Sequence, residues 1–166
     1  MIKPIYLDNQ ATTPMDPKVL KTMIPFFHES FGNASSMHHR YGIEAQEAVE
    51  SSRATLARII GAQEKEIIFT SGATEAINLA IKGIVGKINQ KKHIITQATE
   101  HNAVLDTCRS IEKKGWDVTI LPVDEVGCVD PESIIDAITD QTVLISIMHA
   151  NNEIGTIQDL SLIHIS

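Results

Sequence analysis

The chain has 166 residues, 43% of them hydrophobic and 21% charged, a balance typical of one globular domain with its own core. Its formal net charge of −7 argues against a nucleic-acid partner, because nucleic-acid binding depends on Lys and Arg side chains that neutralise phosphates. No apolar run approaches the roughly 18 residues of a membrane span, and the first residues lack the apolar segment of a secretory signal, so we expect a cytoplasmic protein without a membrane partner.

The N-terminal part is expected to consist mainly of loops and helices. A short extended run at residues 5–7 leads into a loop at 8–17, a helix at 18–27 and a turn at 31–36. A long amphipathic helix is predicted from about Arg40, because apolar residues recur at 3.6-residue spacing as far as Ile59. Gly61 is expected to end this helix.

From residue 66 onward, strand-like and helix-like patterns alternate. Strands are predicted at 66–70, 93–96, 116–121 and 143–148, and helices at 73–84, 102–114 and 131–138. The last strand is almost continuously apolar, which is typical of a strand buried on both faces. The alternation predicts an α/β fold built from βαβ units, with a mostly parallel sheet and flanking helices. Ligands bind beyond the carboxyl ends of such strands, so the candidate site comprises the loops after Thr70, Thr96 and Met148.

The first of these loops, residues 70–75, joins a strand to a helix. Free N–H groups at the start of the helix, together with the Ser71 and Thr74 hydroxyls, would form an anion site. The sequence matches neither a P-loop nor GxGxxG. The structural alternative is a plain helix cap, in which Ser71 is the N-cap and Thr74 or Glu75 completes a capping box.

The other two loops contain a histidine and a pair of asparagines. His101 either bonds to a backbone group at the start of a helix or presents a titratable ring to a flat ligand. Asn151 and Asn152 follow the buried strand, where asparagine also suits an ordinary turn. Because all three loops should lie along one edge of the same sheet, we favour a shared site over three separate structural roles.

The two cysteines show no functional spacing. Cys108 and Cys128 form no CxxC motif and no metal-ligand pattern, so no metal site is predicted. We expect each to be a small buried or half-buried apolar residue rather than a nucleophile.

Five stretches of the sequence form a characteristic set. They are residues 6–14 (YLD and ATTP), 31–40 (FGN, Ser36 and HR), 69–75 (FTSGATE), 99–101 (TEH) and 146–155 (SIMH and NNEIG). In this order they resemble the class V aminotransferases, and within them the cysteine desulfurases of the NifS/IscS type. The resemblance implies a fold-type I transferase large domain that depends on pyridoxal 5'-phosphate, with residues 1–159 as the N-terminal part of the cofactor-binding domain of a homodimer.

The resemblance also implies roles for particular residues. Ala73 and Thr74 would hold the cofactor phosphate, Asn152 would bond the phenolic oxygen of the cofactor ring, and His101 would stack on the ring and relay protons in catalysis. The implied reaction removes sulfur from L-cysteine, giving L-alanine and an enzyme persulfide for an acceptor such as an iron–sulfur scaffold protein. A selenocysteine lyase or another class V enzyme is the alternative within the family. A non-catalytic fragment or interaction protein is the alternative outside it.

Several motifs that this family carries after NNEIG do not occur in the sequence. They are the aspartate that pairs with the pyridine nitrogen, the Schiff-base lysine, the nucleophilic cysteine and the substrate-binding arginine. Neither Cys108 nor Cys128 matches the nucleophile, so we expect a truncated piece that is inactive by itself. Residues 160–166 read like a sequencing adapter translated in one frame, which predicts a non-native tail; a natural helix start is the alternative.

Overall fold

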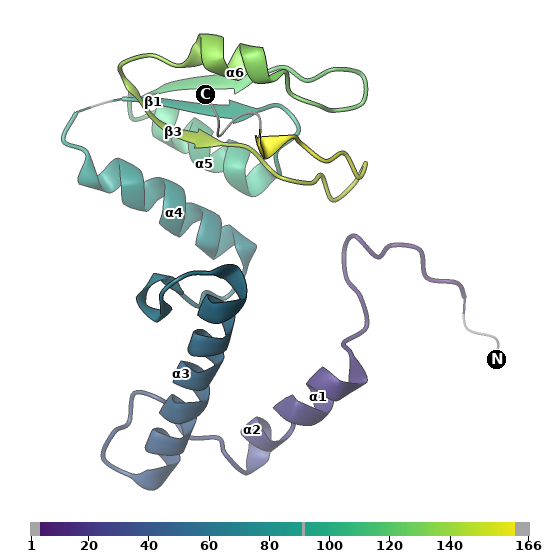
Figure 1. The fold of residues 1–166 in the computed structure, drawn as a ribbon, viewed down its shortest axis with the longest axis vertical. Coiled ribbons are helices and arrows are strands. Elements are labelled where there is room, and N and C mark those ends of the chain that lie inside the picture. Colours follow the sequence, from purple (N-terminus) through teal and green to yellow (C-terminus); the bar gives the residue numbers. More distant parts are fainter. Residues whose placement is uncertain (1–3, 91, 162–166) are drawn as a thin grey trace. The chain divides into compact units, whose positions relative to one another are not determined.

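The computed structural model describes residues 4–90 and 92–161 and divides into two compact units, the first ending at Phe69 and the second beginning at Thr70 (Figure 1). Residues 1–3 and 162–166 lie outside the described residues, so most of the tail predicted at 160–166 lies outside them as well. Within the described part of the chain, no helix is both long enough and apolar enough to span a membrane.

The first unit begins with two short helices in place of the single helix predicted at 18–27. The helix α1 (Pro17–Met23) is capped by Asp16, whose side chain accepts a hydrogen bond from the Lys18 N–H at 2.7 Å. The helix α2 (Pro25–His28) follows directly. Pro25 has no N–H with which to continue the helical hydrogen bonds, so the helix is interrupted at Ile24.

The long helix α3 (Arg40–Ile60) confirms the prediction from periodicity. The side chain of His39 caps its start by accepting a hydrogen bond from the Gly42 N–H at 3.2 Å. Gly61 ends the helix in the left-handed conformation at φ 70°, which glycine adopts without a steric penalty.

The prediction of a strand at residues 66–70 is wrong. Residues Glu64–Glu66 form the short 3-10 helix η1, and no strand among residues 4–90 and 92–161 pairs with the extended segment that follows. Arg53 of α3 holds this segment instead, since its guanidinium donates to the Ile67 carbonyl and lies 5.0 Å from the centre of the Phe69 ring. Side-chain contacts thus replace the backbone ladder that the β-rich composition predicted.

The second unit contains a three-stranded parallel sheet, which confirms the predicted α/β class (Figure 1). The central strand β1 (His93–Gln97) lies between β2 (Asp117–Leu121) and β3 (Thr142–Ser146), and both neighbours run parallel to it. The three strands therefore direct their carboxyl ends, and the loops that follow them, to one side of the sheet.

Helices cover both faces of this sheet, as the predicted alternation requires (Figure 1). The helices α4 (Ala73–Lys87) and α5 (Asn102–Glu112) pack on one face, and α6 (Pro131–Ala137) packs on the other. In Figure 1, α4 and α5 both begin on the side toward which the strand arrows point.

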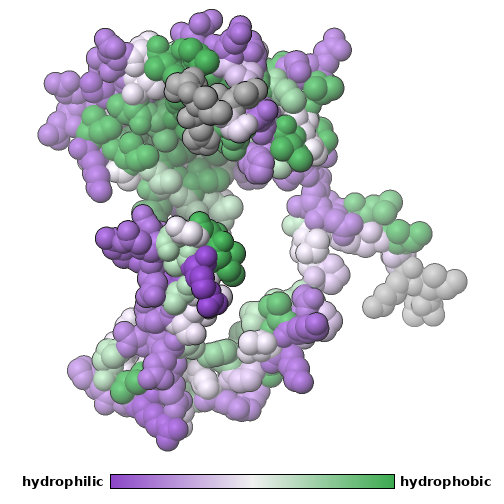
Figure 2. Space-filling model, in the orientation of Figure 1, coloured by the Kyte–Doolittle hydropathy of each residue, from purple (hydrophilic) through white to green (hydrophobic). Residues whose placement is uncertain are grey.

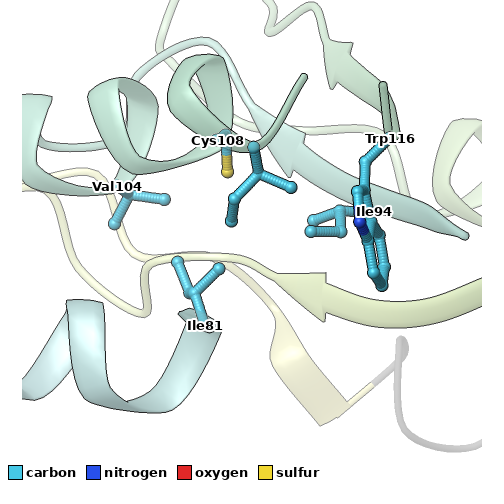
Figure 3. Packing of buried hydrophobic residues seen from close by; sticks show 6 residues of the cluster. Ile81, Ile94, Val104, Cys108 and Trp116 are labelled. Atoms are coloured by element: carbon cyan, nitrogen blue, oxygen red, sulfur yellow. The ribbon is translucent and has the colours of Figure 1, made fainter. Parts of the chain in front are cut away.

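The core of the second unit is organised around β1. Ile94 and Ile95 are fully buried and point to opposite faces of the sheet. The cluster around Ile94 joins α4 and α5 (Figure 3) and consists of Ile81, Ile94, Val104, Cys108, Ile111 and Trp116. The cluster around Ile95 faces α6 and consists of Ile95, Leu121, Val129 and Ile134.

The strand β3 is less buried than its apolar sequence predicted. All five of its residues are half-buried, whereas all five residues of β1 are buried. The reason is position, because β3 is an edge strand in the described sheet and has a paired neighbour on one side only. The expectation of burial on both faces is therefore wrong for β3, and the strand that is buried on both faces is β1.

At the amino end of the sheet, the ring of His93 connects all three strands. Its Nδ1 lies 2.9 Å from the Thr142 hydroxyl of β3, and its Nε2 lies 2.8 Å from the Thr119 hydroxyl of β2. Both ring nitrogens of this buried histidine are thus paired with hydroxyl groups.

Hydrophobic side chains also lie at the surface of both units (Figure 2). In the first unit these exposed residues include Phe27, Ile59, Ile60 and Ile68.

Candidate active site

A cleft of about 300 Å³ lies beyond the carboxyl ends of β1 and β3. The loop after β1 and the loop after β3 supply its lining, which consists of Thr99, Glu100, His101, Asn102, Asn151, Asn152, Glu153 and Ile154. The structure therefore brings His101 and Asn152 to one cleft, as the parallel sheet predicted.

His101 is exposed and is the N-cap residue of α5, where one nitrogen of its ring contacts the helix backbone and the other does not. Its Nδ1 accepts a hydrogen bond from the Ala103 N–H at 3.1 Å, which caps the helix. Since Nδ1 is the acceptor, this bond assigns the proton of the neutral ring to Nε2. Nε2 has no partner in the described part of the chain, so the capping role and a ligand-binding role are compatible.

Asn152 differs from its neighbour Asn151 in its contacts. The exposed side chain of Asn152 forms no hydrogen bond with the residues that the structure describes. An amide without a protein partner retains both its donor and its acceptor for a ligand. Asn152 is therefore the asparagine of this pair that can bind a ligand.

The start of α4 provides free donors, although not through the predicted serine cap. Gly72, not Ser71, is the N-cap residue, and no side chain caps the helix. The N–H groups of Ala73 and Thr74 have no intrahelical acceptor, because the first helical bond runs from Ala76 to the Gly72 carbonyl. The start of α4 lies on the side of the sheet toward which the strands point (Figure 1), but Ala73 and Thr74 do not line the cleft.

Ser71 interacts with Glu75 in the opposite sense to a cap. The Ser71 hydroxyl and N–H donate to the Glu75 carboxylate at 2.6 and 2.7 Å. These two bonds, the hydroxyl bond being the stronger cause, hold the pKa of the Glu75 carboxyl below its usual value. Ser71 is thus committed to Glu75, and the donors of this turn without a partner in the described part of the chain include the Ala73 and Thr74 N–H groups and the Thr74 hydroxyl.

Two residues of the cleft, Glu100 and Asn151, have structural roles that the sequence did not indicate. The Glu100 side chain is 8% exposed and accepts a hydrogen bond from the Met148 N–H. Burial raises the pKa of the Glu100 carboxyl, and the bond from Met148 opposes that shift. Asn151 donates from Nδ2 to the Thr99 carbonyl at 3.0 Å. The one sequence signal for these structural roles is that Glu100 and Asn151 lie directly beside His101 and Asn152.

The loop after β3 is also fixed from its far side. The buried side chain of Gln158 accepts from the Val129 N–H at 3.0 Å and donates to the Gly127 carbonyl at 2.8 Å. A Cβ at Gly127, where φ is +84°, would lie 2.6 Å from the Ile154 side chain. The loop that presents Asn152 is therefore anchored by close contacts before any ligand binds.

The cysteines lie where the sequence predicted. Cys108 is fully buried in the core cluster around Ile94, and burial raises the pKa of its thiol. Cys128 is half-buried. A buried thiol with a raised pKa is a poor nucleophile, which agrees with a structural role for Cys108.

Comparison with known proteins identifies the family. The profile of the family described as Aminotransferase class-V matches residues 5–165. The chain belongs to the class V aminotransferases. It is 55% identical over 161 residues to a protein named Cysteine desulfurase IscS from Rickettsia bellii (strain OSU 85-389), an alignment that covers 96% of this chain and 39% of the relative. A protein of the same name from Rickettsia felis is 55% identical over 158 residues, covering 95% of this chain and 38% of that protein.

Solved structures of the same family agree with this assignment. A structure titled "NIFS-LIKE PROTEIN" has a TM-score of 0.89 at 41% identity and covers 95% of this chain and 44% of its own. A structure titled "SspA in complex with cysteine" has a TM-score of 0.84 at 40% identity and covers 93% of this chain and 44% of its own. The resemblance read from the sequence motifs is confirmed, and the chain spans about two fifths of the length of the relatives it matches.

The family also confirms the predicted cofactor, because class V aminotransferases and cysteine desulfurases depend on pyridoxal phosphate. The residues at the start of α4 fit its phosphate group. The N–H groups of Ala73 and Thr74 lack acceptors, and a Cβ at Gly72 would meet no atom within 4 Å. An anion can therefore approach the helix N-terminus, where the helix dipole favours negative charge.

Proposed function

We propose that the chain is the N-terminal part of a pyridoxal-phosphate-dependent cysteine desulfurase. The proposed reaction converts L-cysteine to L-alanine and leaves the sulfur as a persulfide on the enzyme. The observation that carries the proposal is the pairing of His101 and Asn152 in one cleft at the carboxyl end of a parallel sheet. Relatives named cysteine desulfurase and a similar structure in complex with cysteine support the reaction and the substrate.

Four residues would bind and orient the cofactor. The N–H groups of Ala73 and Thr74, with the Thr74 hydroxyl, would hold the phosphate. The side chain of Asn152 would donate a hydrogen bond to the phenolic oxygen of the cofactor ring. The ring of His101 would stack against the cofactor ring and set its plane. When bound, pyridoxal phosphate supplies an electron sink for the charge that develops at the substrate Cα.

His101 would also act as the catalytic acid–base group. Its Nδ1 is occupied by the Ala103 N–H, so Nε2 is the atom that would give or take a proton. The capping bond holds the ring in one orientation, which keeps Nε2 directed away from the helix backbone. A fixed ring delivers a proton with less loss of conformational freedom than a mobile one.

The assembly and location of the whole protein belong to the same proposal. We propose a cytoplasmic homodimer that passes sulfur to an acceptor such as an iron–sulfur scaffold protein. Residues 1–159 would belong to the cofactor-binding domain, and residues 160–166 would be a non-native tail. The names of the relatives support the sulfur-transfer role.

The test uses the full-length enzyme that carries this segment. Purified enzyme with pyridoxal phosphate should release one alanine for each sulfur transferred from cysteine to a thiol acceptor. Selenocysteine as competing substrate separates a desulfurase from a selenocysteine lyase. Absence of alanine from cysteine, with the cofactor bound, would reject the proposed function.

A further inference from the structure

Two hydrogen bonds join the loop after β1 to the loop after β3 across the cleft. The carboxylate of Glu100 accepts from the Met148 backbone N–H. Asn151 Nδ2 donates to the Thr99 carbonyl oxygen at 3.0 Å. Each bond runs between the two segments that carry the proposed ligand-binding groups, so together they fix the relative position of these segments.

We propose that Glu100 and Asn151 are positioning residues that set the separation of His101 and Asn152 across the cleft without contacting the cofactor. The inference rests on the proposed function, which makes that separation matter for turnover. Catalytic geometry is sensitive to small shifts, since a displacement of about 1 Å can cost about 10²-fold in rate.

The two polar ends of the Asn151 amide have different tasks. Its Oδ1 accepts from the N–H groups of Glu153 and Ile154 at 2.9 and 3.0 Å and so shapes the turn. Its Nδ2 forms the bond to Thr99 and lies 3.5 Å from the Met148 sulfur. Every polar atom of this side chain is used within the protein, which leaves ligand binding to the adjacent asparagine.

Glu100 forms its bond from a buried position. Because its side chain is nearly excluded from solvent, the Met148 N–H has no water to replace a lost acceptor. Glutamine offers the same oxygen acceptor without the charge, so Glu100→Gln keeps the bond. Glu100→Ala removes the acceptor and separates the two segments at this point.

The variants of Asn151 divide its two tasks in the same way. Asn151→Asp keeps an oxygen for the turn but replaces the Nδ2 donor with a second oxygen facing the Thr99 carbonyl.

In the full-length enzyme, we expect kcat/KM of E100A and N151D to fall by about 10²-fold, mainly through kcat, with E100Q within about threefold of wild type. Cofactor content should stay near the wild-type level, because the proposed phosphate donors belong to α4. The exposed residues Glu112 and Asn89 lie outside the cleft, so E112A and N89D are the matched controls.

Amide hydrogen exchange tests the bond between Glu100 and Met148, and the turn bonds of Asn151, without any turnover. Exchange of the Met148 N–H should accelerate in E100A and keep its wild-type rate in E100Q, whereas the Glu153 and Ile154 amides should stay protected in N151D. The proposal is overturned if E100A and N151D match their controls in kcat, or if Met148 exchange is unchanged in E100A. If the wild-type enzyme makes no alanine, the proposed function fails, and the exchange rate of the Met148 N–H alone decides whether Glu100 holds the two segments together.

Discussion

Replacing His101 with asparagine separates the chemistry of its ring from its role at the start of α5. In the structure, Nδ1 caps the helix by accepting the Ala103 N–H at 3.1 Å. An asparagine oxygen can accept the same bond, and asparagine is among the best N-cap residues. Alanine removes the cap and the ring together. His101→Asn and His101→Ala therefore differ from one another mainly in the cap.

The two contributions have very different magnitudes. Loss of an N-cap costs about 0.5–2 kcal/mol of stability, and the exposure of His101 favours the lower end of that range. A protein with roughly 5–15 kcal/mol of stability stays more than about 99% folded after such a loss, so the cap alone leaves turnover per enzyme unchanged. Loss of general acid–base help costs about 10²–10⁴-fold in rate. Both variants should lose turnover by that factor, while only His101→Ala should lose about 1 kcal/mol of stability.

Three measurements on the full-length enzyme decide the outcome. Alanine release from cysteine gives turnover, absorbance of released pyridoxal phosphate gives cofactor content, and denaturant unfolding gives stability. Cofactor content should fall less than turnover, because the proposed phosphate donors are Ala73 and Thr74. Wild-type turnover in His101→Asn would refute the catalytic role and leave His101 as a helix cap only.

Four further outcomes are expected. Glu100→Gln should raise the melting temperature at about pH 8, and this gain should shrink as the pH falls toward about 4. The reason is that burial raises the pKa of the Glu100 carboxyl in the folded state, so the ionised carboxylate lowers stability whereas the protonated form does not. A melting-temperature difference independent of pH would contradict this. In denaturant unfolding, Gly83→Ala on α4 should add about 0.5–1 kcal/mol, since a Cβ there meets no atom within 4 Å. Gly42→Ala should destabilise, because its Cβ would lie 1.8 Å from the Ser36 carbonyl oxygen; a neutral result would contradict this packing. Residues 1–166 alone, treated with pyridoxal phosphate and borohydride, should give neither a stable adduct at one specific lysine nor alanine from cysteine, and detection of both would show that the chain contains the catalytic groups we expect it to lack.

Fold elements with local signals were predictable from the sequence. Gly61 ends α3 because a left-handed residue closes the helix, and that preference is visible in one residue type. The predictions that failed depend on contacts with segments that are distant in the sequence. Residues 66–70 have the composition of a strand, but a strand requires another segment to pair with, and composition contains no information about that segment. The apolar run at 143–148 likewise does not reveal that β3 is an edge strand of the described sheet.

The candidate site was predictable to the level of its loops. Parallel strands bring successive loops to one edge, which predicts that His101 and Asn152 lie together, and both line one cleft. Asn151 shapes the turn through its side-chain hydrogen bonds, whereas the side chain of Asn152 is left for a ligand. Two identical adjacent residues give no sequence signal for which of them takes which role. The roles of Ala73, Thr74, His101 and Asn152 toward the cofactor stay predictions.

The histidine at the amino end of the sheet has a consequence for the opposite end. Because His93 bonds to Thr119 and Thr142 on both neighbouring strands, it fixes the register of β1 against each of them. A slip of one residue would shift a strand by about 3.3 Å and turn its side chains to the other face. Such a shift exceeds the tolerance of a hydrogen bond, so the bond between Glu100 and Met148 would break. The strand alignment that His93 holds at one end of the sheet therefore sets the spacing of the loops that line the cleft at the other end.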